Sequence, residues 1–121
     1  MASPLVSVVD DDESVRDSLP GLVKTFGFAA CAFSSAEGFL ASDRLSQTGC
    51  LILDIAMPGM SGPELQSELK RRQLEIPIIF ITARRDETVR TSMLARGAVE
   101  CLFKPISTAE LRETLKAAFR L

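Results

Sequence analysis

The chain of 121 residues contains no histidine, tryptophan or tyrosine and has only three cysteines. The absence of histidine excludes Ser-His and Cys-His nucleophile pairs and histidine-ligated metals, so any chemistry must rely on carboxylates, hydroxyls and lysines. Cys31, Cys50 and Cys101 lie in apolar segments and lack metal-ligand spacing. We therefore expect them to be reduced thiols with a structural role.

Long apolar runs and long blocks of one charge are also absent. The apolar runs are far too short to cross a bilayer, and the first residues lack the charged and apolar regions of a secretory signal. The net charge is −2 and the longest basic run is Lys70–Arg72, which gives no electrostatic footprint for nucleic acid or a membrane surface. These absences predict a cytoplasmic protein with no membrane partner.

An apolar fraction of 46% is sufficient for a hydrophobic core, and one domain over residues 1–121 is the simplest organisation. Short apolar runs alternate with segments of helical periodicity. The predicted strands cover 5–9, 28–33, 50–53, 76–81 and 99–103. The predicted helices cover 15–26, 34–40, 63–72, 86–96 and 107–119. This order predicts an α/β fold of (βα)5 type, in which helices cover both faces of a doubly wound five-stranded parallel sheet.

Local signals mark several helix ends. Ser34–Glu37 and Ser107–Glu110 fit the S-x-x-E capping box, and Asp11 or Asp12 is available to cap the first helix. Pro20 lies inside that helix, where it should produce a kink. The polar residues 42–49 are predicted to form a loop.

The most informative stretch is Cys50–Gly62, in which an apolar run ends at Asp54 and passes into a turn rich in Pro and Gly. A run without alternation is typical of a strand buried on both faces, so Asp54 should lie at the carboxyl end of a central strand. Ligands of open α/β sheets collect at this edge. Other strands end in functional residue types too, namely Asp10 and Asp11, Thr82, and Lys104.

These residue types at one sheet edge indicate a phosphoryl site. Three clustered carboxylates repel one another unless a cation joins them. Oxygen ligands without histidine or cysteine favour a hard ion, and Mg²⁺ combines a few carboxylates with phosphate oxygens. A lysine and a hydroxyl beside that ion would complete a phosphoryl cradle. Each residue alone has an ordinary explanation as a turn, a cap or a surface charge, but those explanations do not predict the combination.

A known family carries the same combination. The motifs Val8-Val9-Asp10-Asp11, Leu53-Asp54 with Met57–Gly62, Thr82-Ala83 and Lys104-Pro105 resemble the receiver domain of two-component response regulators, particularly the FixJ-type subgroup. The resemblance covers nearly the whole chain. It implies the flavodoxin-like receiver fold and a single phosphoacceptor domain.

The resemblance also implies the composition of the site. Asp54 would accept a phosphoryl group from a sensor histidine kinase in a reaction that requires Mg²⁺. Asp11 would bind Mg²⁺ directly, and Asp10 would do so directly or through water. Asp54 itself and the backbone carbonyl of Ala56 would complete the protein ligands.

Phosphorylation would then act as a conformational switch. Lys104 would pair with the phosphoryl oxygens, and the hydroxyl of Thr82 would swing toward the aspartyl phosphate, drawing in the loop that carries Ala83. The face formed by 86–96, 99–103 and 107–119 would repack. We also expect Arg84, two residues beyond Thr82, to tune the lifetime of the phosphate.

Two positions depart from the family pattern. Many receivers have Tyr or Phe three residues before the lysine, where the ring reports phosphorylation, but this chain has Cys101 there. Phe103 lies on the same side of the predicted strand and is our candidate substitute. Ile106 occupies a position where Phe is common, a change that we expect to affect packing only.

The resemblance describes a phosphoacceptor switch rather than a turnover enzyme, although a receiver catalyses its own phosphorylation and dephosphorylation. We expect a phosphorylation-dependent homodimer through 86–96 and 99–103, and transcription regulation through a DNA-binding effector domain that is not in this chain.

Two alternatives share parts of the pattern. A Mg²⁺-dependent phosphohydrolase with an aspartyl nucleophile usually has a second acid where this chain has Ala56, and a degenerate receiver that acts only as an interaction module would normally have lost an acid or the lysine.

Overall fold

The centre of the computed structural model, which describes residues 4–121, is a five-stranded parallel sheet in the order β2-β1-β3-β4-β5. The strands are β1 (Leu5–Val9), β2 (Ala29–Phe33), β3 (Thr48–Asp54), β4 (Ile78–Thr82) and β5 (Glu100–Phe103). The first three residues of the predicted 1–121 domain lie outside the described part. The predicted sheet is confirmed, and its order places β1, β3 and β4 side by side at the centre.

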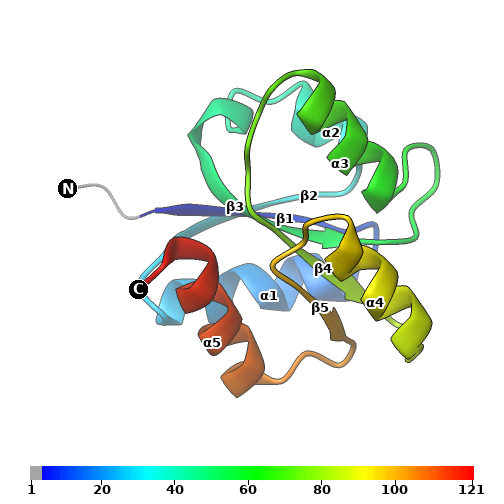
Figure 1. Ribbon diagram of the computed structural model, residues 1–121. Helices are drawn as coiled ribbons and strands as arrows, with labels where there is room; N and C mark the ends of the chain where they lie inside the picture. Colours follow the sequence, from blue (N-terminus) through cyan, green and yellow to red (C-terminus); the bar gives the residue numbers. More distant parts are fainter. Residues whose placement is uncertain (1–3) are drawn as a thin grey trace.

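Five α-helices cover both faces of the sheet (Figure 1). They are α1 (Glu13–Thr25), α2 (Ala36–Leu40), α3 (Gly62–Arg71), α4 (Glu87–Ala95) and α5 (Thr108–Phe119). Helices α1 and α5 pack on one face, and α2, α3 and α4 pack on the other. Within residues 4–121, no helix combines the length and the apolar character that a membrane crossing requires.

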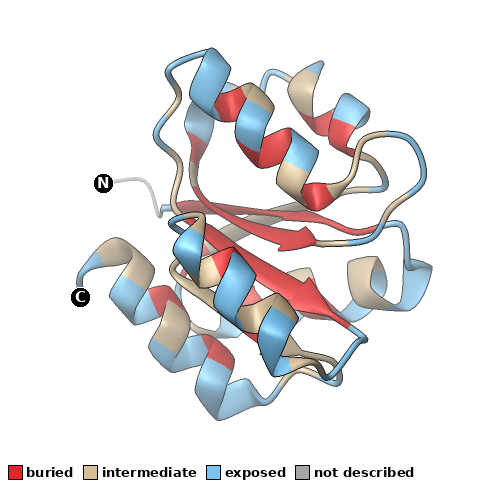
Figure 2. Cartoon of the chain, turned by 45° about the vertical axis from the view of Figure 1, so that its right-hand side comes forward, coloured by how far each residue is buried: buried red, intermediate tan, exposed pale blue. Residues whose placement is uncertain are grey.

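The core consists of two apolar layers, one on each face of the sheet. The buried residues lie along the central strands and on the helix faces turned toward the sheet (Figure 2). Alternate residues of one strand feed the two layers, because successive side chains of a strand point to opposite faces. Val8 therefore packs in the layer under α1 and α5, whereas Val9 packs in the layer under α2, α3 and α4. Both residues are fully buried, which agrees with the unbroken apolar runs of the central strands.

The strand register aligns the carboxyl ends of the central strands. Val9 of β1 pairs with Leu53 of β3, and Asp54 pairs with Ile81 of β4. Thr82 of β4 pairs with Phe103 of β5. The residues that follow these pairs therefore meet at one edge of the sheet.

The helix ends are set by short-range hydrogen bonds. Asp12 caps α1 by accepting from the backbone N–H of Ser14, and the helix continues through Pro20. Helix α3 begins with a complete capping box between Ser61 and Glu64. Of the predicted Ser107–Glu110 capping box, one half forms: the hydroxyl of Ser107 accepts from the N–H of Glu110 at 3.3 Å at the start of α5, but no return bond from the Ser107 N–H to the Glu110 carboxylate is present.

Two local predictions need correction. The Ser34–Glu37 capping box does not form, because Ser35 caps α2 and the carboxylate of Glu37 accepts instead from the N–H of Met60. The predicted loop at 42–49 contains a 3-10 turn over Leu45–Gln47, and β3 already begins at Thr48 because β1 supplies a pairing partner there. Both outcomes depend on contacts with distant segments, which a local pattern does not contain.

Helices α3 and α4 are joined by a polar contact at the C-terminal end of α4. The guanidinium of Arg96 donates to Oε1 of Gln66 at 2.8 Å and to the backbone carbonyl of Pro63 at 2.9 Å. The backbone carbonyl of Arg96 accepts from Nε2 of Gln66 at 3.1 Å and from Nζ of Lys70 at 3.0 Å. Gln66 is buried, so these bonds satisfy a side chain that water cannot reach.

Candidate functional site

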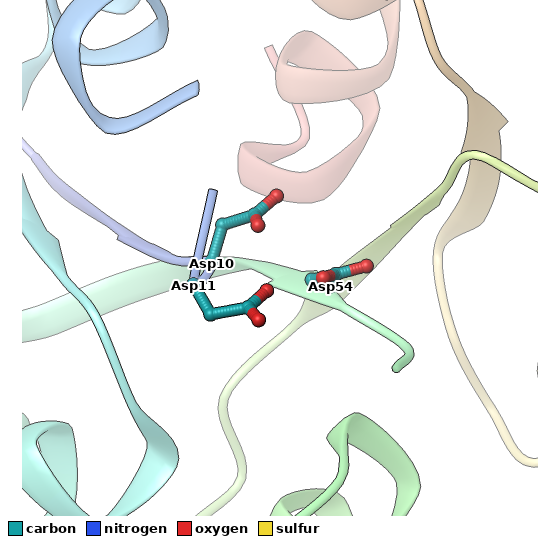
Figure 3. A group of neighbouring side chains, drawn as sticks. All are labelled: Asp10, Asp11 and Asp54. Atoms are coloured by element: carbon teal, nitrogen blue, oxygen red, sulfur yellow. The ribbon is translucent and has the colours of Figure 1, made fainter. Parts of the chain in front are cut away.

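Three carboxylates meet at the edge of the sheet where β1 and β3 end (Figure 3). Asp10 and Asp11 directly follow β1, and Asp54 is the last residue of β3. Each offers an oxygen within 4.8 Å of the others. Asp10 and Asp54 are only 0% and 7% exposed, whereas Asp11 faces solvent. The structure thus brings together the predicted acidic residues in a half-buried cluster.

Asp10 is held by several neighbours. Its Oδ1 accepts from the backbone N–H of Asp12 at 2.9 Å, and its backbone carbonyl accepts from Nη1 of Arg16 at 3.0 Å. Its Oδ2 lies 2.9 Å from Nζ of Lys104, and this ion pair gives the buried oxygen a counter-charge.

Lys104, which follows β5, faces two of the acids. Its ammonium lies 3.8 Å from Oδ1 of Asp54, in addition to the contact with Asp10. Burial acts to lower the pKa of Lys104, but the close contact with Asp10 and the negative charges of Asp10 and Asp54 outweigh it and raise the pKa. The lysine is therefore firmly cationic and neutralises part of the cluster.

Asp54 is the perturbed acid of the cluster. Burial is the largest cause, and the neighbouring carboxylate of Asp10 adds to it, so that the pKa of Asp54 rises to about 7 despite the nearby charge of Lys104. One ammonium is not enough for three carboxylates in so small a volume. A further cation would relieve this repulsion.

The chemistry of these donors fits Mg²⁺. All three ligand candidates are carboxylates, the set preferred by a hard cation. Ala56, the source of the predicted carbonyl ligand, lies two residues after Asp54 in the exposed part of the loop between β3 and α3.

Thr82 and Arg84 lie at the carboxyl end of β4. Thr82 is buried, and its hydroxyl accepts a hydrogen bond from the backbone N–H of Arg84 at 3.1 Å. The backbone N–H of Lys104 donates to the carbonyl of Thr82 at 2.8 Å, which joins the ends of β4 and β5. Ala83 and Arg84 are exposed, and the guanidinium of Arg84 pairs with Asp86 at 3.3 Å. The hydroxyl of Thr82 thus holds its own loop in this structure.

The two residues singled out on β5 have different surroundings. Cys101 is buried in the layer under α2, α3 and α4, where burial raises the pKa of its thiol. Burial also raises the pKa of the Cys50 thiol on β3, to about 12. All three cysteines are free, as expected for structural thiols. Phe103 is only partly buried, and the guanidinium of Arg85 lies 5.9 Å from the centre of its ring.

Sequence reasoning did not identify two residues that contact the site. Arg16 is one of them, although an arginine one helical turn beyond an acidic strand end is a signal that could have found it. Glu37 is the other. Its S-x-x-E spacing predicted a cap of its own helix, but its carboxylate accepts instead from the N–H of Met60, in the loop that follows Asp54.

The family to which the chain belongs follows from comparison with known proteins. The model of the response regulator receiver domain family matches residues 6–116. The chain belongs to this family. It has the flavodoxin-like receiver fold and the phosphoacceptor role of receivers in two-component signalling.

Individual relatives agree with this assignment. Nodulation protein W of Bradyrhizobium diazoefficiens is 42% identical over 114 residues, which cover 94% of this chain and 50% of that protein. Response regulator protein TodT of Pseudomonas putida is 39% identical over 97% of this chain and 52% of its own length. The chain therefore spans about half the length of these curated relatives.

Solved structures show the same fold. The structure of response regulator StyR matches with a TM-score of 0.88 and 43% identity, over 98% of this chain and 60% of that one. The FixJ-N crystal structure matches with a TM-score of 0.87 and 36% identity, over 99% and 96% of the two chains. The predicted resemblance to FixJ-type receivers is confirmed.

Proposed function

We propose that Asp54 accepts a phosphoryl group from a sensor histidine kinase and that Mg²⁺ is required. The observation that carries this proposal is the convergence of Asp54 with Asp10, Asp11 and Lys104 at the carboxyl ends of the central strands. The family places this chemistry in two-component signalling, and a buried carboxylate beside a lysine fits it. The function belongs in the cytoplasm, where a sensor kinase presents its phosphohistidine.

In the transfer step, a carboxylate oxygen of Asp54 attacks the phosphorus atom of the phosphohistidine. The phosphorus–nitrogen bond breaks, its electron pair stays on the imidazole, and an acyl phosphate remains on Asp54. Asp10, Asp11, Asp54 and the backbone carbonyl of Ala56 are the groups that would hold Mg²⁺. When bound, this ion neutralises charge on the phosphoryl oxygens.

The remaining site residues orient the phosphoryl group and respond to it. The ammonium of Lys104 is close enough to Asp54 to pair with a phosphoryl oxygen on that carboxylate. The hydroxyl of Thr82 would donate to another oxygen, which requires it to give up its present bond with the N–H of Arg84. The loop that carries Ala83 and Arg84 is then free to move, and this change passes to α4, β5 and α5.

Slow hydrolysis resets the switch. Water attacks the phosphorus of the acyl phosphate, releasing inorganic phosphate and restoring the Asp54 carboxylate. Aspartyl-nucleophile phosphohydrolases carry an acid two residues after the nucleophile to accept the proton of this water, but Ala56 has no such group. The chain therefore acts as a switch that turns over slowly, not as a phosphohydrolase.

The output is proposed from the relatives. FixJ of Bradyrhizobium diazoefficiens is described as a transcriptional regulatory protein, and this chain covers 56% of its length. We propose that phosphorylation promotes a homodimer through α4 and β5, with Phe103 contributing to the changed surface. DNA would be contacted by an effector domain outside this chain, and the kinase is the direct partner of the receiver.

Incubation of the metal-free protein with acetyl phosphate, with and without Mg²⁺, tests the central claim. We expect intact-mass spectrometry to show one added phosphoryl group only when Mg²⁺ is present, and none on Asp54→Asn. Continuous release of phosphate with no stable adduct would instead indicate a phosphohydrolase. Absence of any reaction would indicate an interaction module.

A further inference from the structure

The carboxylate of Glu37 crosses from α2 to the loop between β3 and α3. Its Oε2 accepts a hydrogen bond from the backbone N–H of Met60 at 3.2 Å. Glu37 is in the first turn of α2, yet Ser35 supplies the cap of that helix. The Glu37 side chain therefore connects two segments that are 23 residues apart in the sequence.

Gly59 makes this approach possible. Its φ is +73°, a conformation that residues with a side chain rarely adopt, and a Cβ atom there would lie 2.7 Å from Oε2 of Glu37. The backbone of the loop and the carboxylate of Glu37 thus fit closely only because this position is glycine.

The loop is fixed separately at its other end. The N–H of Gly62 donates to the carbonyl of Ile55 at 3.0 Å, and Gly62 packs directly against the carbonyl of Asp54, leaving no room for a Cβ atom. Residues 56–61 therefore form a closed turn whose base lies at the acceptor. Glu37 holds the outer part of this turn.

Helix α2 is a rigid support for Glu37. Ala36 and Phe39, on either side of it, are fully buried under the sheet, and the ring of Phe39 packs edge-on against Phe33 at 5.4 Å. A side chain that projects from an anchored helix loses less freedom on binding than one on a loop.

We propose that Glu37 is a positioning residue for the phosphoacceptor site. By holding the N–H of Met60, it fixes the turn that carries Ala56, whose carbonyl belongs to the cation site under the function proposed above. A turn released from Glu37 would have to be ordered again each time the cation binds, which weakens cation binding. Glu37 does not touch the reacting atoms and acts only through the turn.

The first test measures the loop itself in the metal-free protein. We expect amide exchange of Met60, followed by NMR, to be roughly tenfold faster in Glu37→Ala, because a hydrogen bond to a charged group is lost. Glu37→Gln keeps an acceptor oxygen and should stay within about threefold of wild type. Glu113→Ala removes another exposed carboxylate, which is on α5 and pairs only with Lys116 among the described residues, so it is the matched control.

The second test is a titration of the same proteins with Mg²⁺ alone, followed by amide shifts at Asp11 and Asp54. The apparent Kd for Mg²⁺ should rise about three- to tenfold in Glu37→Ala and be largely restored in Glu37→Gln. Unchanged exchange at Met60, an unchanged Kd, or a Glu37→Gln protein that behaves like Glu37→Ala would overturn the proposal. Neither measurement uses a phosphodonor, so failure of the wild-type protein to accept a phosphoryl group would count against the proposed function and not against the role of Glu37.

Discussion

The ammonium of Lys104 lies 2.9 Å from Asp10 but 3.8 Å from Asp54. In the metal-free protein, Lys104 therefore neutralises the fully buried acid of the cluster more strongly than the proposed acceptor. Burial is the main reason for the raised pKa of Asp54, and the repulsion from Asp10, which Lys104 relieves only in part, adds to it. The stability of the metal-free protein and its pH dependence should reflect these unequal contacts of Lys104 with the two acids.

Replacement of Lys104 by Met should destabilise the metal-free protein by about 2 kcal/mol, because it leaves the buried carboxylate of Asp10 without a counter-charge. Urea unfolding monitored by circular dichroism gives the free energy of unfolding. Lys116→Met is the control, since Lys116 is exposed and its pair with Glu113 should contribute less than about 1 kcal/mol. Equal losses in the two variants would contradict a special role for Lys104.

The stability of the metal-free protein should fall as the pH rises from about 4 to about 7. The unfolded chain releases the proton of Asp54 near its ordinary pKa of 3.8, whereas the folded protein keeps it up to a pKa of about 7. Between these values the folded state binds more protons, so the free energy of unfolding decreases with pH.

Comparison with Asp54→Asn isolates this contribution. The variant cannot ionise at this position and should be more stable than wild type by about 1 to 3 kcal/mol above pH 7, with little difference near pH 4. Urea unfolding in the presence of a chelator across this pH range measures the difference. A difference independent of pH would show that Asp54 titrates normally.

Arg84→Ala should shorten the lifetime of the phosphorylated form several-fold. Arg84 is two residues beyond Thr82 and pairs with Asp86, and we expect its side chain to limit the access of water to the acyl phosphate, so that its removal speeds hydrolysis. Loss of the adduct after removal of the phosphodonor can be followed by intact-mass spectrometry. Arg71→Ala, a substitution at the C-terminal end of α3, should leave the rate unchanged. Equal rates in wild type and Arg84→Ala would refute the prediction.

Phosphorylation should convert the protein from monomer to dimer, and Phe103→Ala should weaken that dimer about tenfold because a partly exposed ring on β5 is lost. Light scattering on phosphorylated samples over a range of concentrations measures both effects. Phe28→Leu, in the opposite layer, controls for general loss of an aromatic ring. A monomeric mass for the phosphorylated wild type at high concentration would rule out this output.

Arg96→Ala should destabilise the protein by about 2 kcal/mol, because it removes the side-chain bonds to Gln66 and Pro63 and leaves the buried Oε1 of Gln66 unpaired. Arg71→Ala removes an exposed pair with Glu68 and should cost less than about 1 kcal/mol. Thermal and urea unfolding of the two variants provide the comparison. The prediction fails if both behave alike.

The fold and the acidic cluster could be predicted because they depend on strong local signals. The apolar runs of the central strands end abruptly in charged or hydroxyl residues, and parallel pairing brings such ends together without further information. Strand starts were less predictable. Thr48 belongs to β3 and Ile76 lies outside β4 because pairing with neighbouring strands, not hydrophobicity, determines where a strand begins.

The contacts of long polar side chains could not be predicted. Glu37 and Glu64 both have the S-x-x-E spacing, but Glu64 closes a capping box whereas Glu37 reaches another segment. The difference arises because Ser35, not Ser34, is the N-cap of α2, so that Glu37 does not occupy the N3 position of a capping box. In the same way, nothing in the sequence pairs Gln66 with Arg96, because they are separated by 30 residues and meet only when α3 and α4 pack side by side.

The bonds of Arg96 also constrain how α4 can move. They tie the last turn of α4 to α3, while the first turn follows directly from the loop that contains Thr82 and Arg84. Because these bonds hold the C-terminal end of α4 against α3, and Arg90 pairs with Glu100 of β5 at 2.9 Å, movement of α4 away from its neighbours would have to break polar contacts at both places.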